Sequence, residues 1–170
     1  MIWKSPVQRC LAAALLLAGV SPLRGQTSKT ADVVLSGELR QWHKVTLTLD
    51  GPQADELGDA PNPFMDYRMT VTFAHESGTP TYRVPGYFAG DGDAANSSAS
   101  SGRKWRAHLA PDKTGRWTYR IAFVSGKAVA VTANAEGQGV GPFNGRTGTF
   151  HIAASDILSK NTNVPYITFH

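Results

Sequence analysis

Cysteine is almost absent from this chain: its 170 residues include one, Cys10. Cys10 lies ahead of an apolar run, whereas a lipid-bearing cysteine follows such a run, so we expect no lipid attachment. The rest of the chain has no thiol, which excludes disulfide bonds, thiolate metal ligands and thiol nucleophiles from it. The fold must therefore be held together by a hydrophobic core, and about 145 residues are enough to bury one.

Long apolar runs are also scarce. The clearest one, residues 11–20, is about half the ~20 residues that a membrane-spanning helix needs. It follows two basic residues and precedes a segment of small residues that ends at Gly25, which is the layout of a secretory signal peptide. We therefore predict a signal peptide over residues 1–25 and a secreted or periplasmic protein with no membrane partner once the signal is removed.

The chain has little excess charge once this segment is set aside. The formal charge is +4, from 17 Lys and Arg against 13 Asp and Glu. Lys4, Arg9 and Arg24 belong to the predicted signal peptide, which has no acidic residue, so the remainder carries 14 basic and 13 acidic residues. A nearly neutral domain gives no reason to expect a nucleic-acid partner.

Helical periodicity is missing, and alternation of apolar and polar residues replaces it. Alternation is clear at residues 44–49, 67–73, 104–109 and 116–123, and weaker at 36–41, 81–88, 128–133 and 147–153. A period of two predicts half-buried strands. Turn residues separate them at 50–52, 77–80 and 111–115, the last typical of a hairpin with Gly115 at positive φ. We predict an all-β, immunoglobulin-like antiparallel β-sandwich of about seven to eight strands.

Several motifs occur in one order along the chain: Trp42-His-Lys-Val-Thr-Leu-Thr-Leu-Asp-Gly-Pro52, Asn62-Pro-Phe-Met-Asp-Tyr-Arg68, Val84-Pro-Gly-Tyr-Phe-Ala-Gly-Asp-Gly92, Lys104-Trp105 and Pro111-Asp-Lys-Thr-Gly-Arg-Trp-Thr-Tyr119. In this order and spacing, residues 38–155 resemble the domain-of-unknown-function 5060 family. The resemblance implies an immunoglobulin-like module near the N-terminus of secreted bacterial proteins, usually preceding a glycoside-hydrolase-like (β/α) barrel. It carries no catalytic residue onto this sequence.

The resemblance leads to a prediction of function. We expect a domain at residues 33–154 and a short tail at 155–170, where a family member would continue into its barrel. The tail is consistent with a truncated gene product, a frameshifted copy or a stand-alone version. We predict a non-catalytic accessory module, not an enzyme, which packs against a catalytic barrel or targets it. The alternative is a free-standing carbohydrate-binding module with a polysaccharide as its partner.

Aromatic residues are the first candidates for such a site. Trp105 and Trp117 share the apolar phase of their strands, which favours packing in the core. Trp42 is out of phase with the apolar residues that follow it, so its ring is expected to point away from the core. We predict carbohydrate binding by Trp42 and Tyr87, with Tyr166 as a further companion.

Metal ligands are sparse. Asp91, Asp93 and Asn96 place three oxygen-bearing side chains close together, which is compatible with Ca²⁺. No bidentate glutamate follows, and the same residues are typical of a plain turn; both interpretations stay open, and no other cofactor is expected. Two aspartates on one loop are a poor match for paired catalytic carboxylates. The five histidines show no metal-binding spacing, although His43 shares its phase with the apolar Val45.

Overall fold

The structure is a computed structural model that describes Met1 and residues 33–156. The predicted signal peptide and residues 157–170 of the predicted tail, including Tyr166, lie outside the described residues. In the described part the elements are β1 (Val33–Ser36), β2 (Val45–Asp55), β3 (Tyr67–His75), β4 (Thr81–Pro85), β5 (Tyr87–Phe88), α1 (Ala94–Ser97), β6 (Ser101–Leu109), β7 (Gly115–Ser125), β8 (Gln138–Gly139) and β9 (Thr147–Ile152). None of the helices described is long and apolar enough to cross a membrane.

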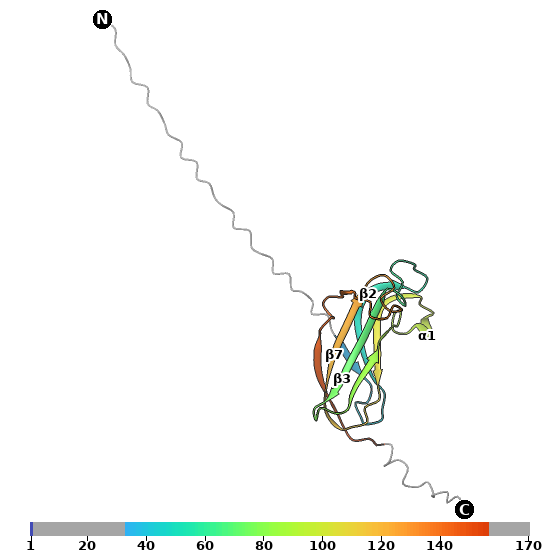
Figure 1. The fold of residues 1–170 in the computed structure, drawn as a ribbon, viewed down its shortest axis with the longest axis vertical. Helices are drawn as coiled ribbons and strands as arrows, with labels where there is room; N and C mark the ends of the chain where they lie inside the picture. Colours follow the sequence, from blue (N-terminus) through green and yellow to red (C-terminus); the bar gives the residue numbers. More distant parts are fainter. Residues whose placement is uncertain (2–32, 157–170) are drawn as a thin grey trace, which may run out of the picture.

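The strands form two antiparallel sheets that pack face to face (Figure 1). The first sheet has the order β1-β2-β6-β5. The second has the order β4-β3-β7-β8, and β9 also pairs with β7. Apart from the short β8, this arrangement matches strands A-B-E-D against C′-C-F-G of the immunoglobulin fold. The predicted all-β, immunoglobulin-like sandwich is therefore confirmed.

The core lies between the inward faces of the two sheets. Buried residues alternate along each long strand, as in Val45, Leu47 and Leu49 of β2. Trp105 and Trp117 are buried at its centre, so their predicted packing role is confirmed. Each indole N–H donates to a backbone carbonyl, Trp105 to Pro52 (3.1 Å) and Trp117 to Lys113 (3.0 Å). Both polar groups are thus satisfied, which burial requires.

The strands predicted at residues 44–49, 67–73, 104–109 and 116–123 are confirmed as parts of β2, β3, β6 and β7. The strand predicted at 36–41 lies earlier in the chain, because β1 ends before Gly37, which has φ 108°. The predicted end of a strand at Asp50-Gly-Pro52 is wrong. β2 continues to Asp55, with a shift in its pairing with β6 between Asp50 and Ala54.

The turn predicted at residues 111–115 is present, and Gly115 has φ 112°. It is not a hairpin, however, because β6 and β7 belong to different sheets. The segment is a crossover from one layer of the sandwich to the other. Sequence alternation predicts strands but does not tell which strand each one pairs with.

The strand predicted at residues 128–133 is wrong. Side chains satisfy the backbone there instead of a neighbouring strand: Arg68 donates to the carbonyls of Val129 (3.0 Å) and Ala135 (2.7 Å). The carboxylate of Asp66 accepts from the Ala128 N–H (2.8 Å). These bonds fix residues 126–137 as an irregular loop that leads to β8.

Candidate functional site

Trp42 lies in the turn before β2 with 56% of its surface exposed. Its backbone N–H donates to the Pro111 carbonyl (2.8 Å), which ties this turn to the crossover between β6 and β7. The side chain lines a hollow of about 380 Å³ together with Tyr82, His108 and Asp112; we call it the Trp42 hollow. An exposed aromatic face on a hollow is the arrangement expected of a residue that stacks on a ligand ring.

Asp112 gives the Trp42 hollow a polar wall. Its Oδ2 accepts a hydrogen bond from the Tyr82 hydroxyl (2.7 Å), whereas its Oδ1 is buried and accepts none. The hydrogen bond to Asp112 raises the pKa of Tyr82 above its ordinary value, and burial contributes in the same direction. A buried oxygen without a donor is uncommon in folded proteins.

Tyr87, the second predicted carbohydrate-binding residue, is on β5 with 44% of its surface exposed. Its hydroxyl is 2.8 Å from Nε2 of His108, and Nδ1 of His108 is 2.9 Å from the Thr46 hydroxyl. Burial, followed by the charges of Lys44 and a neighbouring arginine, lowers the pKa of His108. A neutral His108 therefore links Tyr87 to β2, and His108 also lines the Trp42 hollow.

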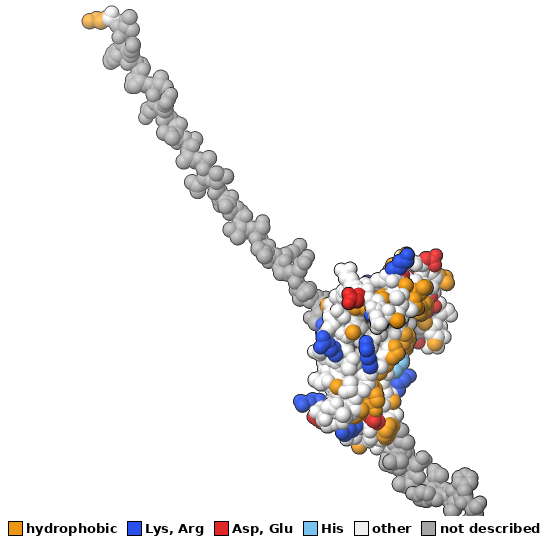
Figure 2. All heavy atoms as spheres, in the orientation of Figure 1, with side chains coloured by type: hydrophobic (Ala, Val, Ile, Leu, Met, Phe, Trp, Pro, Cys, Tyr) orange, Lys and Arg blue, Asp and Glu red, His pale blue; other side chains and the backbone are white. Residues whose placement is uncertain are grey.

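Hydrophobic side chains gather along the right-hand edge of the domain in Figure 2. At the end of the sandwich where β2 runs into its following loop, Phe64, Met65 and Val131 are each at least 47% exposed. The Ala130 N–H donates to the Met65 carbonyl (2.9 Å), so the two loops that carry these residues touch. We call these three residues the loop-end patch.

A hollow of about 650 Å³ adjoins the loop-end patch and includes Met65, Asp66, Tyr67 and Lys127 in its lining. Asp66 accepts backbone hydrogen bonds from Ala128 (2.8 Å) and from the residue that starts the preceding turn. These two bonds, helped by the charge of Lys127, hold the pKa of Asp66 below its ordinary value of 3.8. Burial, with a further contribution from Asp66, raises the pKa of Tyr67. The Asp66 carboxylate thus holds the β2–β3 loop and the β7–β8 loop together beside this hollow.

Of the predicted calcium ligands, Asp91 and Asp93 lie in the loop before α1, and Asn96 lies within α1 itself. Oδ1 of Asp91 accepts from the Asp93 N–H (2.7 Å), and Oδ1 of Asp93 accepts from the Asn96 side-chain amide (2.7 Å). A hydrogen bond from Ser97, followed by the one from the Asp93 backbone, lowers the pKa of Asp91. In this geometry the oxygens serve the loop itself, and the calcium site stays a prediction.

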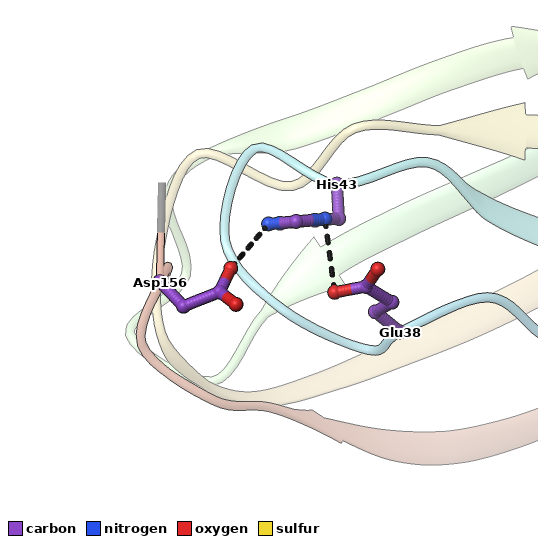
Figure 3. A group of neighbouring side chains, drawn as sticks. All are labelled: Glu38, His43 and Asp156. Atoms are coloured by element: carbon purple, nitrogen blue, oxygen red, sulfur yellow. Dashed lines mark ion pairs between the residues drawn. The ribbon is translucent and has the colours of Figure 1, made fainter. Parts of the chain in front are cut away.

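Glu38, His43 and Asp156 form a cluster at the opposite end of the sandwich (Figure 3). Nδ1 of His43 is 3.2 Å from Oε2 of Glu38, and Nε2 is 3.2 Å from Oδ1 of Asp156. The imidazole is 18% exposed and lies between the two carboxylates. Glu38 and His43 come from the β1–β2 turn, and Asp156 follows β9, so the cluster joins the two sheets. We call it the His43 clasp.

The three residues of the His43 clasp also offer one nitrogen and two oxygens within 4.8 Å of one another, which is a set that could hold a divalent metal. A metal ion bonds to one ring nitrogen of a histidine, while the other nitrogen is held by a partner. Here the two carboxylates lie against different ring nitrogens. The observed arrangement therefore favours a histidine that bridges two carboxylates over a metal centre.

Sequence reasoning did not anticipate His108, Asp112 or Asp156 as site residues. Asp156 reaches His43 from the far end of the domain, so no local spacing could reveal the pair. His108 sits on the polar face of a predicted strand, where a histidine is unremarkable until its partners on β2 and β5 are known. One indication was present in the sequence: His43 shares its phase with the apolar residues of the following strand. The structure agrees, because the His43 side chain is 18% exposed.

The comparisons with known proteins are limited but specific. The model of a family described as "Domain of unknown function (DUF5060)" matches residues 38–124. No curated protein matches the chain. Among solved structures, the chain is similar to a crystal structure of a "putative glycoside hydrolase" from Bacteroides vulgatus ATCC 8482, with 22% identity and a TM-score of 0.44. The similarity covers 68% of this chain and 16% of that chain, and at this TM-score it carries no argument about function.

Proposed function

Because this chain belongs to the DUF5060 family, whose function is unknown, we propose that it is an accessory β-sandwich module of a secreted, carbohydrate-active protein. Its role is to pack against a glycoside-hydrolase-like barrel, and it performs no catalysis itself. The resemblance described above, in which such modules precede a barrel, motivates the choice of partner. The predicted signal peptide motivates the secreted or periplasmic location.

The loop-end patch is the observation that supports this proposal most directly. Contiguous exposed apolar residues are uncommon on soluble domains and often mark an interface with another protein or domain. Met65 lines the hollow of about 650 Å³, into which a partner side chain can insert, and the exposed Phe64 precedes it in the chain. Both oxygens of Asp66 are occupied by backbone N–H groups, which makes this carboxylate a poor general base and favours a docking role for the hollow.

The proposal is tested by binding. The partner is the glycoside-hydrolase barrel encoded closest to this sequence in its genome, purified separately and captured on a sensor surface. We expect the full chain to bind it and the double variant Phe64→Asp/Met65→Asp to bind about tenfold more weakly or worse, because charges would be buried at the interface. Val34→Asp is the matched control, since Val34 is an exposed apolar residue on β1. Equal binding by all three proteins, or none by the wild type, contradicts the proposal.

A free-standing carbohydrate-binding module is the second candidate. The observation that favours it is the pair of exposed aromatic rings, Trp42 and Tyr87. His108 lines the hollow beside Trp42 and is bonded to the Tyr87 hydroxyl. This function needs no barrel, and it uses the edge of the sandwich rather than the loop-end patch. The two candidates can therefore be separated by variants in different places.

A further inference from the structure

The outer face of the first sheet carries a second hollow next to Tyr87. It measures about 370 Å³, and its lining includes Glu56, Tyr87, Asp93 and Arg106. Tyr87 of β5 and Arg106 of β6 are direct partners in the strand register, so their side chains share this face. We call it the Tyr87 hollow. It is distinct from the Trp42 hollow, whose lining contains none of these four residues.

The Tyr87 ring is held in place before any ligand arrives. Its hydroxyl is bonded to Nε2 of His108 (2.8 Å), and the two ring centres are 5.5 Å apart. His108 is itself fixed by the Thr46 hydroxyl (2.9 Å). The ring nevertheless keeps 44% of its surface exposed. An aromatic face that is both fixed and exposed loses little conformational entropy when a ligand stacks on it.

Arg106 supplies hydrogen-bond donors. Its Nε is buried and has no hydrogen-bond partner, and no carboxylate in residues 33–156 forms an ion pair with it. The guanidinium lies over Gly92, where an added Cβ would be 3.1 Å from Nη2. Arginine donors in partly buried positions are normally satisfied. The outer Nη groups of Arg106 also make no hydrogen bond within residues 33–156, and Arg106 lines the hollow, so these groups can donate to a ligand that accepts hydrogen bonds.

Acceptors line the same hollow. Glu56 makes no side-chain hydrogen bond within the described residues, and the Asp93 carboxylate uses Oδ1 for the Asn96 amide (2.7 Å). The hollow therefore presents a cation and two carboxylates together. A carboxylate or phosphate ligand would be attracted by Arg106 but repelled by Glu56 and Asp93. A hydroxyl group both donates and accepts, and is matched by the mixed set.

We propose that the Tyr87 hollow is a binding subsite for one uncharged pyranose unit of a polysaccharide. The sugar ring stacks on Tyr87, and its neighbouring hydroxyls bond to Arg106 and to the carboxylates of Glu56 and Asp93. This inference rests on the second candidate function and names its ligand class. Trp42, beyond His108, is placed to contact a further sugar of the same chain.

The test uses the full chain in affinity electrophoresis and calorimetry against two sets of glycans. The neutral set contains β-glucan, xylan, mannan and galactan oligosaccharides, and the acidic set contains polygalacturonate and alginate oligosaccharides. We expect binding within the neutral set and none within the acidic set. Tyr87→Ala and Arg106→Ala should each weaken binding by about tenfold, the loss typical of a central contact. Tyr87→Phe keeps the stacking ring and should lose only a few-fold.

Arg103→Ala is the matched control, because Arg103 is an exposed arginine on the same strand outside the Tyr87 hollow. Circular dichroism and thermal unfolding of each variant establish that it is folded. A preference for the acidic set, no binding to either set, or full binding by Tyr87→Ala overturns the subsite. If Trp42→Ala alone abolishes binding, the carbohydrate-binding function survives while the subsite is wrong. The barrel-docking proposal is unaffected by any of these results.

Discussion

Gly51 lies within β2, directly against the indole ring of Trp105. A Cβ added to Gly51 would collide with Cδ1 of Trp105 and come within 2.8 Å of its Nε1. Trp105 is buried, and its indole N–H is held by the Pro52 carbonyl. The ring therefore has no space to move into, because protein cores are packed with few voids.

Gly51→Ala is expected to lower the free energy of unfolding by about 1–3 kcal/mol, the usual cost of overpacking a core. Urea denaturation followed by tryptophan fluorescence measures it. Gly126→Ala is the control, because the nearest heavy atom to its added Cβ is 3.6 Å away; its effect should stay within about 0.5 kcal/mol. Equal losses in the two variants would mean that the contact with Trp105 is not the cause.

The sequence predicts the position of some single residues correctly and misses the contacts of others. Alternation is a local property, so it correctly placed Trp105 and Trp117 in the core and Trp42 outside it. The role of Gly51 depends on a tryptophan from another strand, so the Gly-Pro pair was interpreted as a turn. The partners of His108 also lie on other strands, so the sequence did not reveal them. Contacts between distant parts of the chain leave no mark on local spacing.

At the scale of elements, the loop between β7 and β8 shows why a strand-like pattern can fail. Its apolar residues alternate, yet only Val129 of residues 128–133 is buried. Arg68 and Asp66, located at the start of β3, satisfy the backbone groups that a neighbouring strand would otherwise bond. The alternation was real, but the structure provides no strand for this segment to pair with.

Asp66→Asn is expected to destabilise the protein at neutral pH, because the amide places an N–H₂ group where a carboxylate oxygen now accepts a backbone hydrogen bond. The folded-state pKa of Asp66 is lowered from 3.8. Its stabilising contribution is therefore complete above the unfolded pKa and is lost as the pH falls through the lower, folded pKa. The stability difference between wild type and variant should thus shrink below pH 3.8.

Urea denaturation of both proteins across a pH series measures this difference. Asp59→Asn is the control: Asp59 lines the same hollow, and its side chain accepts no hydrogen bond within the described residues. It should show no comparable loss at neutral pH. A stability difference for Asp66→Asn that is unchanged in acid would exclude the carboxylate's charge as the source of its effect.

At the scale of the whole molecule, the two sheets are joined by more than the core between them. Opposite the loop-end patch, the Gln41 N–H donates to the Ala153 carbonyl (2.9 Å), and the Ala153 N–H donates to the Leu39 carbonyl (2.9 Å). The His43 clasp adds one contact across the same junction, between His43 and Asp156. In a fold with no disulfide within residues 33–156, these contacts take over part of the cross-linking that a disulfide provides in antibody domains.

The fold class followed from the sequence because a period of two, frequent turns and suitable length all indicated a sandwich. The resemblance named the same architecture, and the family match agrees with it. The junction of the sheets could not be predicted, since it brings residues near the start of the domain against residues after its last strand. The loop-end patch and the hollows beside Trp42 and Tyr87 could not be predicted either, because each is formed by segments that only the folded chain brings together.

His43→Gln tests the junction. The imidazole lies between Glu38 and Asp156, and glutamine retains polarity but removes the one group of the three that can carry a positive charge. We expect a loss of about 1 kcal/mol in the free energy of unfolding at low ionic strength, the upper range for partly exposed pairs. The loss should diminish in about 1 M NaCl, where charges are screened over roughly 3 Å.

His151→Gln is the control, because His151 is an exposed histidine on β9, and this variant should behave as wild type. A salt-independent loss would show that packing of the ring matters more than its charge. A rise in melting temperature with Zn²⁺, present in the wild type and absent in His43→Gln, would replace the ion-pair interpretation with a metal site.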